Sequence, residues 1–226
     1  MDPTSAEHAP AATTPTTPGR RRGRPAGTKG VPRAVREEQI LAAAMEEFGR
    51  HGHAAASMAS IARRVGVTKP MLYAYFDSKD GLYLACLEDV AARVRTAVEA
   101  AMSAGPPDSP GARLPHAVLT GLFTALEEQR YAWFVLYDRS LPPGSAVRAA
   151  AQRHREAVDT LAASGTAALL HDRGNADPLD ADALKHVWTG TVSALMGWWI
   201  AHPDQSARDM SARCARLLTA IRTTPS

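Results

Sequence analysis

The sequence predicts an all-α fold with about nine helices. Apolar residues recur at helical spacing through most of the chain after residue 34, and no stretch between turn signals alternates as a strand would. Breaks rich in Gly and Pro, such as "SAGPPDSPGARLP" and "RGNADP", separate these patterns. We expect a disordered basic arm over residues 1–33, a three-helix unit over 34–80 and a larger helical domain over 81–226.

The arm combines low complexity with a local excess of positive charge. Residues 1–19 are rich in Pro, Thr and Ala and lack apolar periodicity, so they cannot bury enough surface to become ordered. Seven basic and no acidic residues follow between Arg20 and Arg36, although the formal net charge of the whole chain is only +3. This asymmetry favours a polyanionic partner for the N-terminal part.

The first helix is predicted from Ala34 onwards. Ile40, Ala44 and Phe48 recur at helical spacing, and Gly49 and Gly52 indicate the end of the helix.

Two short capped helices follow. Ser57 is a candidate N-cap for one that ends at Gly66, and Thr68 is a candidate N-cap for the next, with Pro70 near its first turn. A capped helix, a tight turn at glycine and a second capped helix form the layout of a helix-turn-helix, whose second helix enters the major groove of DNA.

Three segments of this region, "ILAAAMEEFGRHG", "SIARRVGVTKPMLYAYF" and "SKDGLY", together resemble the TetR family of transcriptional regulators. The resemblance runs from about Val35 to Leu82. It implies that the first three helices bind a palindromic DNA operator, and that the remainder forms a helical domain for ligand binding and dimerisation. Ligand entry would release the DNA. After about residue 82 only the number and length of the helices match, so the resemblance does not indicate which ligand is bound.

The family pattern also implies which side chains contact DNA. Those expected to face base edges and nearby phosphates are Thr68, Lys69, Pro70 and Tyr73. Those expected to hold phosphates are Ser57, Tyr75 and Lys79. Hydroxyls and N-terminal amides can fix the register on the DNA backbone, and a lysine can donate to guanine. Core packing is the alternative for both tyrosines, and Pro70 departs from the family, which often has a small residue there.

The arm contains "RGRP" at residues 22–25, which resembles an AT-hook. Arg22 and Arg24 would then lie in the narrow minor groove of A·T-rich DNA, where the negative potential is deepened. From Arg24 to Arg33 the chain can span at most about 30 Å, which is close to one turn of duplex. The alternative is a solvated basic tail that adds only nonspecific affinity.

A longer helix is expected after "FDSKDG", with Leu87, Val90, Val94 and Val98 as its apolar stripe. Later helices are expected at about 113–129, 130–140, 145–173, 180–202 and 204–222. Two of them carry stripes suited to a two-fold interface between copies. The small-residue stripe consists of Gly190, Ala194, Gly197 and Ala201. The stripe on the last helix consists of Met210, Cys214, Leu217 and Ile221. We expect a homodimer, with packing inside one monomer as the alternative.

An aromatic set on the middle helices is a candidate lining for an apolar effector pocket. With one methionine, the set comprises Phe123, Trp133, Phe134, Tyr137, Trp188 and Met196. Core packing is the stronger alternative for any single member. Gln129, Arg139 and His154 are possible polar anchors for the effector.

We expect no metal, cofactor or catalytic activity. His51 and His53 in "HGH" are expected to face solvent, and Cys86 and Cys214 are too far apart to indicate a metal cluster or a disulfide framework. No phosphate loop, G-x-S-x-G or H-E-x-x-H pattern occurs. The longest apolar run, "VSALMGWWIA", has half of the roughly 20 residues that a membrane span needs. We therefore expect a cytoplasmic regulator; the rivals are an enzyme that uses none of these motifs and an architectural DNA-binding protein without a ligand.

Overall fold

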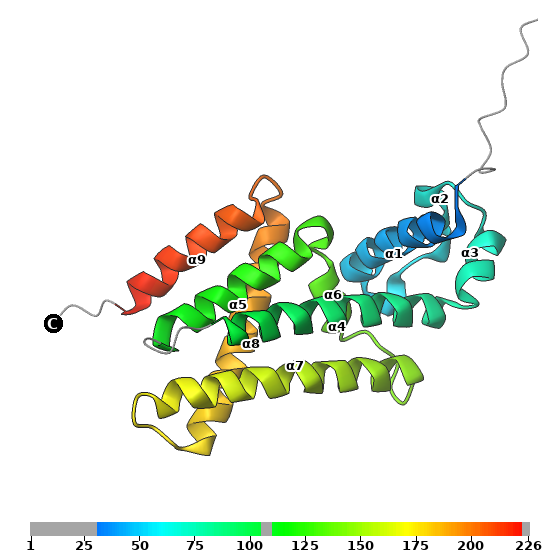
Figure 1. Ribbon diagram of the computed structural model, residues 1–226. Coiled ribbons are helices and arrows are strands. Elements are labelled where there is room, and N and C mark those ends of the chain that lie inside the picture. Colours follow the sequence, from blue (N-terminus) through cyan, green and yellow to red (C-terminus); the bar gives the residue numbers. More distant parts are fainter. Residues whose placement is uncertain (1–30, 105–109, 223–226) are drawn as a thin grey trace, which may run out of the picture. The chain divides into compact units, whose positions relative to one another are not determined.

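The computed structural model describes residues 31–104 and 110–222, and these residues form nine α-helices and no strand (Figure 1). The all-α prediction and the helix count are therefore confirmed within those ranges. The helices are α1 (Arg33–Ala55), α2 (Met58–Val65), α3 (Lys69–Phe76), α4 (Lys79–Ser103), α5 (Pro110–Leu126), α6 (Ala132–Leu136), α7 (Ala146–His171), α8 (Pro178–Ala201) and α9 (Ala207–Arg222), with a 3-10 turn, η1 (Glu127–Gln129), before α6. None of the helices in the described ranges is both long and apolar enough to cross a bilayer.

Helices α1 to α3 pack around a small apolar core. Its fully buried centre is formed by Ile40, Ala44, Phe48, Ile61 and Leu72. These are the residues that the helical spacing assigns to one face of each helix, and their burial removes that face from water.

The end of α1 differs from the prediction. Gly49 lies inside the helix, and a Cβ atom there would be 2.3 Å from the carbonyl oxygen of Tyr131. This glycine therefore permits the close approach of α1 to the segment before α6. The helical path breaks at Gly52, where φ is 70°, a conformation that favours glycine. One further turn follows, up to Ala55.

The long helix α4 connects the three-helix unit to the rest of the chain. It packs against α1, α5, α6 and α7, and its stripe of Leu87, Val90 and Val94 is fully buried. The Tyr83 hydroxyl donates to the Val135 carbonyl of α6 at 2.7 Å. Helix α4 therefore packs against both the three-helix unit and the C-terminal helices.

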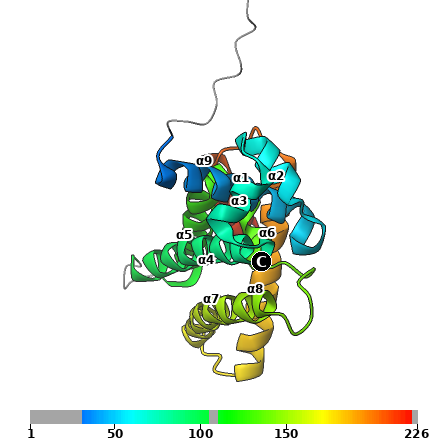
Figure 2. The same ribbon diagram turned by 90° about the vertical axis from the view of Figure 1, so that its right-hand side faces the viewer.

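The C-terminal helices surround α4. Helix α7 lies beside α4 and is crossed by α8, and α9 packs along α5 (Figures 1 and 2). Met210 and Cys214 of α9 are fully buried within this chain. Burial raises the pKa of the Cys214 thiol, consistent with a packing role for this side chain.

Candidate functional site

The turn between α2 and α3 is closed by backbone hydrogen bonds. Gly66 has φ 73° and ψ 31° and donates to the Ala62 and Arg63 carbonyls. The Val67 amide donates to the Ala62 carbonyl at 2.9 Å. This arrangement is a Schellman motif, in which glycine supplies the left-handed residue. The helix end predicted at Gly66 is confirmed.

Both predicted N-caps are also confirmed. The Ser57 hydroxyl accepts from the Ser60 amide at 3.3 Å, and the Thr68 hydroxyl accepts from the Met71 amide at 3.3 Å. The buried carboxylate of Glu47 in α1 accepts from the Ser57 amide at 3.0 Å and from the Ser60 hydroxyl at 3.1 Å. Glu47 therefore fixes the start of α2 on α1, a role that no local sequence pattern indicates.

The start of α3 presents polar groups to solvent. Thr68, Lys69 and Pro70 are exposed, and Tyr73 is half-buried. The Lys69 ammonium lies 5.9 Å from the centre of the Tyr73 ring. The first turn carries no acidic residue, so no side chain of that turn neutralises the positive end of the helix. Such a terminus is suited to a phosphate or another anion.

Tyr75 is half-buried on the other side of α3, and the Arg33 guanidinium lies 5.2 Å from the centre of its ring. Arg33 was counted in the basic stretch but was not assigned to the site. Its partner is far along the chain, so no local pattern could have indicated the contact.

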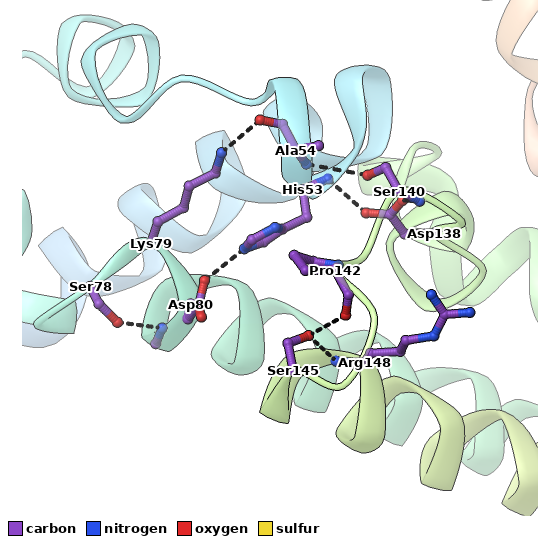
Figure 3. Close-up of polar contacts among 11 residues, drawn as sticks. His53, Ala54, Ser78, Lys79, Asp80, Asp138, Ser140, Pro142, Ser145 and Arg148 are labelled. Carbon is purple, nitrogen blue, oxygen red and sulfur yellow. Dashed lines mark hydrogen bonds and ion pairs between the residues drawn. The ribbon is translucent and has the colours of Figure 1, made fainter.

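Lys79 is engaged by the protein itself. Its ammonium donates to the Ala54 carbonyl at 3.2 Å, which ties the start of α4 to the last turn of α1 (Figure 3). Two of its three protons remain available to another acceptor. Arg22 and Arg24 lie outside the described residues.

A small apolar cavity of about 90 Å³ lies between α4, α5, α7 and α8. Of the six predicted pocket residues, Trp133, Tyr137 and Trp188 line it. Phe123 and Met196 are fully buried core residues instead, and Phe123 packs edge-on against the Trp199 ring, with 5.1 Å between centroids. Their large apolar side chains on the middle helices are the reason for the prediction, and that property does not distinguish the wall of a cavity from a packed core.

An open cleft of about 640 Å³ adjoins the apolar cavity, and Tyr137, Asp159 and Thr189 line both. The sixth predicted pocket residue, Phe134, lines this cleft. Of the possible polar anchors, Arg139 also lines the cleft, whereas the His154 ring lies 3.1 Å from the Glu88 carboxylate. Gln129 lines a separate cleft beside α1.

The segment after Tyr137 contacts the last turn of α1 (Figure 3). One Asp138 oxygen accepts from the His53 amide at 2.6 Å, and the other accepts from the Ser140 amide at 2.7 Å. The Ser140 hydroxyl accepts from the Ala54 amide at 3.2 Å. We call residues 138–140 the clamp. It joins a residue of the apolar cavity to the helix that precedes the helix-turn-helix.

His53 is buried, contrary to the expectation that it faces solvent. One ring nitrogen lies 2.8 Å from the Asp80 carboxylate at the start of α4, and the other has no hydrogen-bond partner among the described residues. The ring packs against Tyr83 with 5.1 Å between centroids. His51 is exposed. In the part of the chain that the structure describes, no group of three or more His, Cys, Asp or Glu side chains is placed to hold a metal.

The eight predicted interface residues have different surroundings. Gly190, Ala194 and Ala201 are exposed on α8, and Gly197 is half-buried. Leu217 and Ile221 of α9 are 46% and 80% exposed, whereas Met210 and Cys214 face this chain's own core. Val187 of α8, which the prediction omitted, is 64% exposed beside the small-residue stripe.

Comparisons with known proteins agree with this geometry. Residues 40–86 match the family model described as bacterial regulatory proteins, tetR family. The HTH-type transcriptional activator FasR of Mycolicibacterium smegmatis is 42% identical over 118 residues, covering 42% of this chain and 54% of FasR. The chain spans about half the length of the curated relatives it matches.

Two solved structures extend the comparison to most of the chain. A TetR-like transcriptional regulator from Rhodococcus sp. RHA1 is 28% identical, covers 84% of this chain and 96% of its own, and has a TM-score of 0.57. FadR from Bacillus subtilis, solved in complex with stearoyl-CoA, is 16% identical, covers 80% of this chain and 96% of its own, and has a TM-score of 0.57. The similarity to FadR concerns the fold alone.

Proposed function

We propose that the chain is a TetR-family transcriptional regulator rather than an enzyme, as the match of residues 40–86 to the family model and the similarity to FasR support, and that it binds a palindromic operator as a homodimer and is released by a small hydrophobic effector. We propose that this regulator is a cytoplasmic repressor. FasR is named as an activator, so the direction of regulation is part of the proposal.

The exposed start of α3 is the observation that carries the DNA-binding part. Thr68, Lys69 and Tyr73 lie on the first turns of the second helix of a helix-turn-helix, without an acidic neighbour in the first turn. We propose that Lys69 and Tyr73 contact base edges and that Thr68 and Pro70 lie at nearby phosphates. Ser57, Tyr75 and Lys79 would hold the flanking phosphates. The proposed hook, Arg22 and Arg24, would add minor-groove contacts.

Exposed apolar and small residues on α8 and α9 support the homodimer. Gly190, Ala194 and Ala201 would allow α8 of two copies to approach closely, and Leu217 and Ile221 would be covered by the partner. Met210 and Cys214 would support this surface from beneath, because they already pack within the chain.

The apolar cavity supports the effector part. Trp133, Tyr137 and Trp188 line it, but its volume of about 90 Å³ is well below the roughly 300–1,000 Å³ of ordinary ligand pockets. A bound effector must therefore push the lining helices apart. Because Tyr137 directly precedes the clamp, that displacement would reach the last turn of α1 and alter the spacing of the two recognition helices.

A binding titration tests the DNA-reading assignment. We would measure the affinity of variants for a duplex recovered by selection from random sequences and for an unrelated duplex. Lys69→Ala and Tyr73→Ala should each weaken binding to the selected duplex by about 1–3 kcal/mol, whereas Lys79→Ala should weaken binding to both duplexes alike. Arg153→Ala, which removes an exposed charge on α7, is the control. Unchanged affinity and base preference in Lys69→Ala would contradict the assignment.

The rival function is a ligand-independent architectural protein that uses the arm and the helices to shape DNA. A thermal-shift survey with a library of hydrophobic small molecules separates the two functions. A sensor should be stabilised by at least one compound, and that compound should also lower operator affinity. Stabilisation by none of them would favour the architectural function.

A further inference from the structure

We propose that the effector is an amphipathic anion, whose hydrocarbon part enters the apolar cavity and whose carboxylate or similar head group lies in the adjoining cleft against Arg139 and Arg155. This inference rests on the proposed effector-binding function and narrows the ligand to one chemical class.

The apolar cavity and the adjoining cleft share lining residues, but only the cleft has several charged side chains. Val94, Leu122 and Trp188 are among the residues of the inner cavity, which is predominantly apolar. The outer cleft also has apolar walls, such as the Phe134 ring, but it carries charged side chains from the clamp, α7 and α8 as well. Since Tyr137 and Asp159 line both, a molecule that filled the two would be apolar at one end and polar at the other.

The charges of the cleft favour a negative head group. Arg139, Arg155 and Lys185 line it together with one carboxylate, Asp159. Lys185 is already paired with Asp182 at 2.8 Å. With that pair set aside, two guanidinium groups and one carboxylate line the cleft. One nitrogen of Arg155 donates to the Asp138 carbonyl at 3.4 Å, and its other N–H groups are left to bind a ligand. Arginine can bind a carboxylate through two parallel hydrogen bonds, so these two side chains are suited to such a head group.

Tyr137 supplies a hydrogen-bond donor where the two hollows meet. Its hydroxyl is buried and has no hydrogen-bond partner among the described residues. Burial raises the pKa of the Tyr137 phenol above its ordinary value, and the charge of Asp159 adds to this shift. The hydroxyl therefore keeps its proton. An unpaired buried donor is costly, and an oxygen of the ligand would satisfy it.

The hollows also differ in size in a way that suits this ligand. The cleft, at about 640 Å³, is already open to a head group, whereas the cavity, at about 90 Å³, must widen to admit a chain. A flexible hydrocarbon can enter a narrow cavity progressively, while a rigid bulky molecule needs the full width at once. The anion would be held first at Arg139 and Arg155, and the chain would follow.

Three probes of equal chain length test the head-group preference. Decanoate, decanol and decyltrimethylammonium would be titrated below their micelle concentrations against the full-length protein, with tryptophan fluorescence as the readout, because Trp133 and Trp188 line the cavity. We expect decanoate to bind at least about tenfold more tightly than decanol, which corresponds to one charge-assisted hydrogen bond, and the cation to bind most weakly.

Variants locate the head group. Arg139→Gln and Arg155→Gln should each weaken decanoate binding about five- to tenfold and leave decanol binding unchanged, and Arg153→Gln on the exposed side of α7 is the matched control. Arg139 is exposed, so its replacement tests the site without disturbing the core. Tyr137→Phe should weaken both probes, since both carry an oxygen.

The outcomes separate this inference from the effector function. The anion site would be overturned if decanoate and decanol bound equally tightly. It would also be overturned if Arg153→Gln weakened decanoate binding as much as Arg139→Gln and Arg155→Gln do. Either result would leave the sensor proposal standing. Binding of none of the three probes would overturn the anion site as well. If the hydrophobic library also failed to stabilise the protein, the sensor proposal itself would fall.

Discussion

The clamp should contribute measurably to stability, and Asp138→Ala is the substitution that tests it. The Asp138 carboxylate is buried and accepts from two backbone amides, His53 at 2.6 Å and Ser140 at 2.7 Å. A hydrogen bond to a charged group contributes about 1.5–3 kcal/mol. The His53 amide is buried with its residue, so it loses its partner without gaining water, whereas Ser140 is exposed and its amide can be hydrated.

We therefore expect Asp138→Ala to lower the free energy of unfolding by about 2–4 kcal/mol. For a chain of this size the melting temperature should fall by roughly 5–15 °C. Asp138→Asn keeps the shape and one acceptor oxygen but places an amide group against the second N–H, so its loss should be intermediate. Urea denaturation followed by circular dichroism measures the free energy, and thermal melting gives the temperature.

The exposed Asp172 at the far end of α7 provides the control. Asp172→Ala should change the unfolding free energy by no more than about 0.5 kcal/mol, as is usual for surface substitutions. If Asp138→Ala were as mild as this control, residues 138–140 would not hold α1, and the proposed route from the cavity to the helix-turn-helix would lose its basis.

Three further predictions address packing, assembly and the arm. Gly49→Ala should destabilise the protein by about 1–3 kcal/mol in urea titrations, because its Cβ would lie 2.3 Å from the Tyr131 carbonyl oxygen; unchanged stability would refute the close approach. Gly197→Arg should give monomers without operator affinity, and a sedimentation profile that remains dimeric would refute the interface assignment. Deletion of residues 1–30 should reduce the slope of log K against log[salt] by roughly 2–4 units and abolish a preference for A·T over G·C flanks; if the full-length protein has no such preference, the arm is only a basic tether.

The parts of the fold that depend on local signals were predictable. Ser57, Gly66 and Thr68 each act through hydrogen bonds to residues a few positions away, and the structure has those bonds. Helical spacing also located the buried faces of α1 and α4, because a face depends only on the residues of its own helix.

Contacts between distant segments were not predictable. Asp138 meets His53 across 85 positions of sequence, and no pattern within either segment indicates the other. Gly49 has the sequence signature of a helix end, yet it serves a close contact with Tyr131.

The lining of the candidate pocket was likewise only partly predictable from the sequence. Spacing indicates that a residue faces inward, but not whether it meets a cavity or a neighbouring side chain. Trp133 lines the cavity while Phe123 packs on Trp199, although both are aromatic residues on inner faces.

Selection of duplexes from a random-sequence pool by the full-length protein tests the central claim most directly, because operator binding by a two-fold dimer specifies the form of the selected sequence. The enriched duplexes should contain an inverted repeat, whose half-sites are centred about one helical turn (~34 Å) or a multiple of it apart. The same selection with Tyr73→Ala should weaken or change the half-site. Enrichment of no sequence above the starting pool, or of a single unrepeated half-site, would contradict the account.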